Sequence, residues 1–204
     1  MMSSTVEVTT EEKIKEAAKA VFTRKGYAAT TVRDIAAEAD INLSLVNYYF
    51  RSKEKLFQLI MTETVQQLFD QIQPVLNDEE TTLGEKIELL VGHYIDMILR
   101  NPDFPFFMVN EVMSGSIESP MVNNIKNVQG SVFARQVHAL KAGGKFDFEP
   151  IHVMMNLMGM ILFPFLSKNV IIKSGALNDE EFVRTITERK RLIPIWMKQM
   201  LNII

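Results

Sequence analysis

Apolar residues recur at helical spacing along almost the whole chain, beginning with residues 9–25. Positions three and four residues apart share one face of a helix, so this stretch predicts an amphipathic helix. Thr9 has Glu12 at the spacing of a capping box, and Gly26 stands where such a helix should end. The apolar stripe consists of Ile14, Ala17, Ala18, Val21 and Phe22.

Two short helices around a tight turn are predicted within residues 31–50. Thr31 and Asp34 have capping-box spacing at the start of the first helix. Asp40 can take the left-handed conformation that a sharp turn needs, and Asn42 can cap the second helix. A second helix held at a steep angle after such a turn is the geometry that enters the major groove of DNA. In the second helix we expect Leu45, Val46 and either Tyr49 or Phe50 to face inward, and Leu43, Ser44, Asn47 and Tyr48 to face outward.

The rest of the chain keeps helical spacing and has no run of alternating apolar and polar residues that would indicate a strand. Ser52 should cap a long helix that Pro74 ends. We expect helices at residues 53–73, 83–100, 104–113, 120–141, 150–168 and 178–201. The fold class is therefore predicted as all-α, with a three-helix helix-turn-helix DNA-binding domain at residues 1–52 and a helical effector-binding and dimerisation domain at residues 53–204.

Two segments, VFTRKGYAATTVRDIAAEA and VNYYFRSKEKLF, resemble the DNA-binding domain of the TetR family of bacterial transcriptional regulators. The resemblance covers about the first quarter of the chain, and the remainder is similar only in its helical layout. Asp40 stands where glycine is usual in the family, and Leu43 stands where lysine is frequent. The resemblance implies a ligand-responsive repressor, released from a palindromic operator by a small apolar or amphipathic effector.

The same resemblance implies which side chains contact DNA. Hydroxyls, lysines and helix N-termini bind phosphate oxygens, whereas amides on an exposed helix face read base edges. Asn47 is the best candidate for a base contact, since an amide can pair bidentately with adenine. Arg33 and Arg51 are secondary candidates. The groove-facing set is Asn42, Leu43, Ser44, Asn47 and Tyr48, and the phosphate-binding set is Thr30, Thr31, Tyr49 and Lys53.

Methionine and phenylalanine, thirteen of each in the chain, crowd the second domain. One interpretation is a plain core, in which methionine fills irregular gaps. The other is an apolar cavity for a small-molecule effector, which the resemblance favours, with a few polar groups that orient the ligand. The candidate effector-binding residues are Tyr94, Phe107, Met108, Glu111, Met154, Met155 and Met158.

Two C-terminal helices are more apolar than burial in a small domain requires. Ile151–Leu166 is apolar on most faces, and residues 182–201 carry a stripe of their own. We expect these helices to form a four-helix bundle in a two-fold homodimer, although a monomer that buries both stripes internally is the alternative. In a dimer, the recognition helices of the two copies would read successive major grooves about 34 Å apart.

Charge adds only weak support for DNA binding. The net charge is −3, and residues 1–60 hold nine Lys or Arg against eight Asp or Glu. Binding must therefore depend on where individual cations lie. The chain has no cysteine, and its N-terminus lacks a basic segment followed by an apolar run, so we expect a cytoplasmic protein without a signal peptide. We expect no membrane partner.

Catalytic patterns are weak in this sequence. The three histidines, His93, His138 and His152, have neither metal-ligand spacing nor a neighbouring nucleophile. We therefore expect no enzyme activity, no metal site and no cofactor. The alternative function is an all-α protein that binds a lipid or another small molecule and has no DNA-binding activity.

Overall fold

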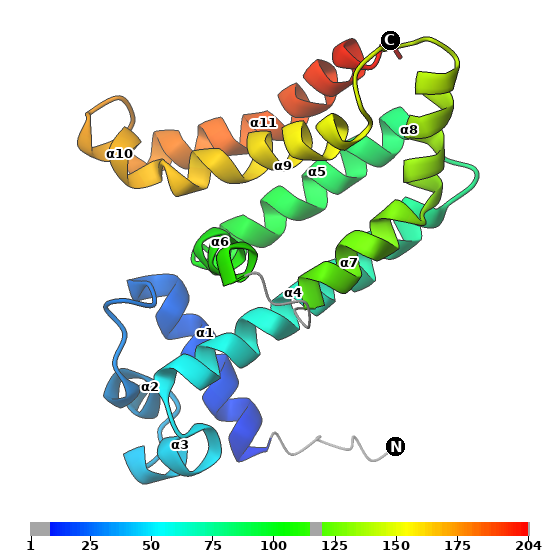
Figure 1. The fold of residues 1–204 in the computed structure, drawn as a ribbon. Helices are drawn as coiled ribbons and strands as arrows, with labels where there is room; N and C mark the ends of the chain where they lie inside the picture. Colours follow the sequence, from blue (N-terminus) through cyan, green and yellow to red (C-terminus); the bar gives the residue numbers. More distant parts are fainter. Residues whose placement is uncertain (1–8, 115–119, 204) are drawn as a thin grey trace, which may run out of the picture. The chain divides into compact units, whose positions relative to one another are not determined.

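A computed structural model describes residues 9–114 and 120–203 (Figure 1). Within these ranges the regular elements are helices and no strand occurs, so the all-α prediction is confirmed. The helices are α1 (Thr10–Lys25), α2 (Val32–Glu38), α3 (Leu43–Phe50), α4 (Lys53–Asn77), α5 (Leu83–Arg100), α6 (Phe104–Ser114), α7 (Pro120–Gln129), α8 (Val132–Ala142), α9 (Ile151–Leu166), α10 (Lys168–Lys173) and α11 (Asp179–Met200).

The chain divides into two compact units, Met1–Val65 and Gln66–Ile204. The division falls inside α4, so that this helix belongs to both units. The domain boundary expected between residues 52 and 53 stays a prediction. Each unit has its own apolar core and is described separately below.

The first unit is built from α1, α2, α3 and the first half of α4. As predicted, Thr9 and Glu12 form a capping box at the start of α1, and Gly26 ends the helix with a positive φ of 77°. The helix α1 packs against α2, and Ile35 of α2 and both Leu56 and Ile60 of α4 are fully buried in the core of this unit. At the end of α1, the ring of Phe22 meets that of Phe57 edge-on at 5.3 Å. The three short helices therefore depend on α4 to complete their core.

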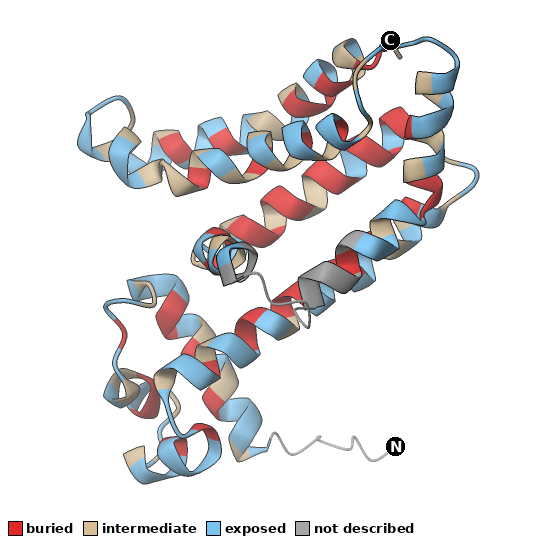
Figure 2. Cartoon of the chain, in the orientation of Figure 1, coloured by how far each residue is buried: buried red, intermediate tan, exposed pale blue. Residues whose placement is uncertain are grey.

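The second unit is centred on α5, which packs against α8, α9 and α11 (Figure 1). Buried residues follow one another along α5 (Figure 2). Two lysines of α11, Lys190 and Lys198, form ion pairs with Asp96 and Glu88 of α5. These pairs lie at the partly exposed edges of a largely apolar contact, so they align the two helices more than they stabilise them.

Two predictions about helix bounds in the second unit are wrong, and the short α10 was not predicted. Pro74 does not end α4, which continues to Asn77; a proline fixes a helical φ and removes one hydrogen bond, so a helix can continue past it. The helix expected at 120–141 is two helices, and Ser131 caps the second of them by accepting from the N–H of Ala134 at 3.2 Å. Finally, the helix that begins near Pro150 ends at Leu166, and the short α10 follows it without a side-chain cap.

Within the described residues, every helix is too short or too polar to cross a membrane.

Candidate nucleic-acid interface

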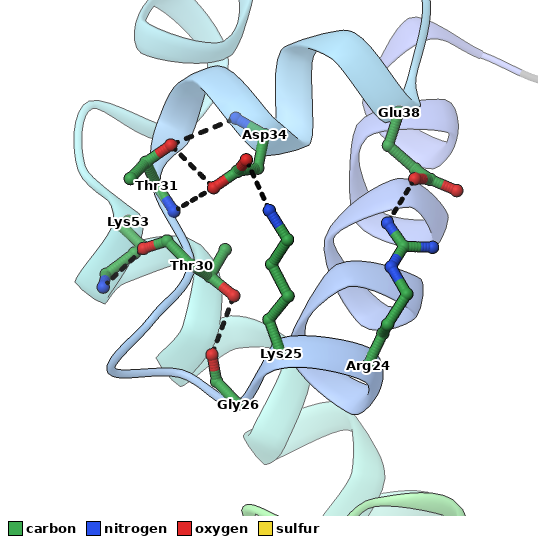
Figure 3. Close-up of polar contacts among 8 residues, drawn as sticks. All are labelled: Arg24, Lys25, Gly26, Thr30, Thr31, Asp34, Glu38 and Lys53. Atoms are coloured by element: carbon green, nitrogen blue, oxygen red, sulfur yellow. Dashed lines mark hydrogen bonds and ion pairs between the residues drawn. The ribbon is translucent and has the colours of Figure 1, made fainter.

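The start of α2 is held by the predicted capping box. The hydroxyl of Thr31 accepts from the N–H of Asp34 at 3.2 Å, and the Asp34 carboxylate accepts from the N–H of Thr31 at 2.8 Å (Figure 3). Lys25, in the last turn of α1, donates to the same carboxylate at 2.7 Å. The ammonium of Lys25, followed by the two hydrogen bonds from Thr31, holds the pKa of Asp34 well below its usual range. The carboxylate is therefore ionised at neutral pH and ties α2 to α1.

A second ion pair fixes the other end of α2. Arg24 of α1 and Glu38 of α2 approach to 2.6 Å, and the guanidinium lowers the pKa of the Glu38 carboxyl (Figure 3). Both cations in the last turn of α1 therefore bind carboxylates of α2. They orient the helix pair and contribute little net charge toward a phosphate backbone.

The turn between α2 and α3 has the predicted geometry. Asp40 has a φ of 52°, in the left-handed region that a short polar side chain tolerates. The N–H of Ile41 reaches back to the carbonyl of Ala36 at 3.0 Å. Asn42 then caps α3, its side-chain oxygen accepting from the N–H of Ser44 at 3.0 Å. This turn sets the direction in which α3 leaves α2.

The buried face of α3 is narrower than predicted. Val46 and Phe50 are buried, as expected, and they lie four residues apart on one stripe of the helix. The prediction that Leu45 faces inward is wrong, because Leu45 is 40% exposed, and Tyr49 is 42% exposed. Since α3 has only two turns and packs mainly on α2, one stripe suffices to hold it, and the neighbouring stripe that carries Leu45 and Tyr49 remains at the surface.

The exposed face of α3 contains the residues predicted to enter the groove (Figure 2). Tyr48 is 78% exposed and meets the ring of Tyr49 edge-on at 5.4 Å. The hydroxyl of Ser44 donates to the capping oxygen of Asn42 at 3.0 Å, and Leu43 is half-buried. The amide of Asn47 is exposed and has no hydrogen-bond partner among the described residues, so both its donor and its acceptor remain for a base edge.

Two predicted phosphate contacts have other partners. The side chain of Thr30 is buried, and its hydroxyl donates to the carbonyl of Gly26 at 2.8 Å, so the prediction that it binds phosphate is corrected. The ammonium of Lys53 donates to the carbonyls of Tyr27 and Thr30, both at 2.8 Å, and lies 4.2 Å from the centre of the Tyr27 ring. Lys53 thus ties the α1–α2 loop to α4, which leaves at most one of its three protons for a phosphate.

Other cations of the first unit are better placed for phosphates. Arg33, Arg51 and Lys55 are exposed and form no ion pair with any described residue. Arg51 ends α3 with a positive φ of 61°, and its N–H donates to the carbonyl of Asn47 at 2.9 Å. Sequence reasoning missed Lys55. The apolar spacing of α4 indicates that its neighbour Leu56 is buried, as it is in the structure. This spacing would have predicted that Lys55 lies at the surface.

The predicted effector-binding residues separate into three groups. Tyr94 and Phe107 are buried, and burial raises the pKa of Tyr94 to about 12. Met108, Met154 and Met158 are half-buried. Met155 is 60% exposed, so the prediction that it lines an internal cavity is not supported. The side chain of Glu111 lies outside the described residues. Among the described residues, no group of three or more His, Asp or Glu side chains is arranged to hold a metal ion.

Comparisons with known proteins agree with this geometry. Residues 14–60 match the family model described as bacterial regulatory proteins, tetR family. YttP of Bacillus subtilis, a probable HTH-type transcriptional regulator, is 23% identical over 172 residues, which are 81% of this chain and 82% of the relative. The HTH-type transcriptional repressor NicS of Pseudomonas putida is 25% identical over 134 residues, 66% of this chain and 63% of the relative.

A solved structure of a bacterial regulatory protein in the tetR family from Rhodococcus RHA1 has the same fold, with a TM-score of 0.62 at 21% identity, covering 96% of this chain and 98% of that one. The capped helix pair, the exposed α3 and these matches support a DNA-binding, helix-turn-helix regulator of transcription. Over residues 14–60 the chain is similar to the tetR family, and the chain has the fold of the tetR-family structure from Rhodococcus RHA1.

Proposed function

We propose that this regulator is a repressor that binds a palindromic operator as a homodimer and leaves it when a small apolar or amphipathic effector binds the second unit. The observation that carries the proposal is the exposed face of α3, whose Asn47 amide has no partner among the described residues. A polar face on the second helix of a helix-turn-helix is the arrangement that reads bases in the major groove. Repression is supported by the match to NicS, which is named a repressor. Such a regulator acts in the cytoplasm, where the operator lies.

Exposed apolar residues on α9 and α11 support the homodimer. Ile151, Met155 and Phe163 are exposed and lie at multiples of four residues along α9, which makes them one ridge of that helix. On α11, Val183, Ile195 and Trp196 are also exposed. Because α9 and α11 pack on each other, a two-fold copy of this helix pair would complete a four-helix bundle.

An effector site in the second unit is supported by the character of its interior. Tyr94 and Phe107 are buried, and the half-buried Met108, Met154 and Met158 offer flexible, polarisable walls. The helix α4 continues from the first unit into the second. An effector that binds more tightly to a conformation with displaced DNA-binding units would release the operator, since a ligand shifts an equilibrium only by its differential affinity.

Selection of random duplexes by the purified full chain tests the proposal. We expect enrichment of a palindrome whose half-sites lie about 10 base pairs apart, or a multiple of this, as two recognition helices require. The enriched duplex and the DNA upstream of the chain's own gene are then compared in gel shifts. Failure to enrich any sequence would overturn operator binding. Enrichment of a single, unrepeated half-site would overturn the homodimer.

Release is tested with the same duplex. Apolar and amphipathic small molecules that raise the melting temperature of the protein are added to the preformed complex. A compound that binds and dissociates the complex supports the mechanism, and compounds that all bind without changing operator affinity would contradict it.

A further inference from the structure

The recognition helix α3 contains no charged residue. Its sequence is LSLVNYYF, and the residues of this helix that are exposed are Ser44, Leu45, Asn47, Tyr48 and Tyr49. The exposed face therefore presents one free amide, the Ser44 hydroxyl that already donates within the turn, the neutral phenol groups of Tyr48 and Tyr49, and otherwise apolar or aromatic surface. This composition limits which base pairs the helix can recognise.

Each base has preferred partners in the major groove. Guanine presents two acceptors that Arg or Lys satisfies, and cytosine presents a donor that Asp or Glu satisfies. Adenine presents a donor beside an acceptor, which the amide of Asn or Gln matches with two hydrogen bonds. Thymine presents a methyl group that apolar and aromatic side chains contact. The exposed face of α3 has partners for adenine and thymine and lacks the charged partners of guanine and cytosine.

We infer that α3 selects A·T pairs, with the Asn47 amide hydrogen-bonded to adenine and the Tyr48 ring against the methyl group of a thymine. The inference rests on the proposed operator binding and names the bases that the operator presents. Tyr48 is 78% exposed. Its ring stands edge-on to that of Tyr49, with an angle of 87° between the two ring planes. Its ring is therefore held on the outward face by a contact that needs no DNA.

The nearby free cations do not supply a guanine reader. Arg51 lies at the C-terminal end of α3, whereas the N-terminal residues of a recognition helix approach the bases. Arg33 is on α2, the helix that crosses the backbone in this motif. Both guanidinium groups are therefore assigned to phosphates, where they add affinity without base preference.

Base analogues in the best duplex from the selection test this inference. Replacing adenine by 7-deazaadenine removes the N7 acceptor and should weaken binding roughly tenfold per half-site at the adenine that Asn47 contacts. Replacing thymine by deoxyuridine removes the methyl group and should weaken binding about fourfold at the thymine that Tyr48 contacts. Replacing guanine by 7-deazaguanine should leave binding unchanged within the half-site.

Variants assign each effect to its side chain. Asn47→Ala should lose the sensitivity to 7-deazaadenine, and Tyr48→Ala should lose the sensitivity to deoxyuridine, which Tyr48→Phe should keep. Arg51→Ala should weaken every duplex by the same factor and keep both sensitivities. The inference is overturned if 7-deazaguanine weakens binding as much as 7-deazaadenine, or if Asn47→Ala remains sensitive to 7-deazaadenine. A chain that binds no duplex at all would instead overturn the proposed operator binding.

Discussion

Lys25 and Asp34 form an ion pair that joins α1 to the first helix of the helix-turn-helix. The carboxylate of Asp34 accepts from the Lys25 ammonium and from both the N–H and the hydroxyl of Thr31 (Figure 3). These donors favour the charged form, which is why the pKa of Asp34 lies well below its usual range. One carboxylate thereby starts α2 and joins it to the end of α1.

Replacing Asp34 should destabilise the fold in a pH-dependent way. Since the folded pKa lies below the unfolded value of about 3.9, the carboxylate stabilises the folded state above pH ~4 and loses this effect as the pH falls through the folded pKa. Asp34→Asn should therefore lower the melting temperature at pH 7, and its difference from the native chain should narrow below pH ~4. Asp40→Asn is the matched control, because asparagine tolerates the same left-handed turn. A difference that stays constant from pH 7 to pH 3 would contradict this account.

Capping residues were predictable from the sequence, because a cap and its partner are only two or three residues apart. The caps at Thr9, Thr31, Asn42 and Asn178 are all found in the structure. The errors concern contacts between distant segments. Whether Leu45 is buried depends on what packs against α3, and the partners of Lys53 lie more than twenty residues away.

At the scale of elements, Lys86 holds the loop between α4 and α5. This lysine is fully buried, and its ammonium donates to the carbonyl of Asp78 at 2.6 Å and to both the carbonyl and the hydroxyl of Thr81, at 2.7 and 2.6 Å. All three protons are therefore satisfied. The sequence analysis made no prediction for Lys86, since a buried lysine is stable only when the folded loop supplies acceptors, and these come from residues outside its own helix.

Lys86→Met should be strongly destabilising although methionine is apolar and of similar length. The substitution removes all three hydrogen bonds of the ammonium and leaves the Asp78 carbonyl and the Thr81 hydroxyl without this donor, while the Thr81 carbonyl keeps that of Gln136, so we expect the free energy of unfolding to fall by roughly 3 kcal/mol. Urea denaturation followed by circular dichroism measures it. Lys173→Met, at an exposed lysine of α10, is the control and should change stability by less than about 0.5 kcal/mol. Equal stability of the two variants would show that the Lys86 hydrogen bonds are unimportant.

The proposed binding of a palindromic operator requires two copies of the chain. The exposed ridge of α9 and the exposed apolar residues of α11 are surfaces that a second copy would cover. A dimer also brings two recognition helices to one palindrome. The ratio of affinities for the operator and for other DNA is then the square of the ratio that a single α3 provides. The weak net charge of the first unit makes this doubling more important.

Phe163→Glu should therefore disrupt the dimer. Phe163 is 67% exposed on α9, and a carboxylate there would be buried without a partner at the two-fold interface. Sedimentation velocity at micromolar concentration should show a dimer for the native chain and a monomer for the variant. Val170→Glu, which changes an equally exposed apolar residue of α10, should remain dimeric. A native chain that sediments as a monomer would contradict the proposed assembly.

Operator binding should weaken strongly as the salt concentration rises. Arg33, Arg51 and Lys55 are assigned to phosphates, because they lie on or next to the helix-turn-helix, are exposed and form no ion pair with any described residue. If each cation neutralises one phosphate in both copies, the logarithm of the binding constant should fall with a slope of about −5 against the logarithm of salt concentration. A slope near zero in fluorescence anisotropy titrations would show that these cations do not contact the backbone.

The exposed face of α3 should contact DNA, and the affinity of Ser44→Glu for the selected duplex measures this contact. Glutamate in the first turn of a helix is favourable for the fold, so the variant should melt like the native chain. Its carboxylate would face the bases and phosphates, and we expect affinity to fall at least about 100-fold. Gln58→Glu, the same change of charge at an exposed site on α4, should bind nearly as well as the native chain. Native-like affinity of Ser44→Glu would contradict the account.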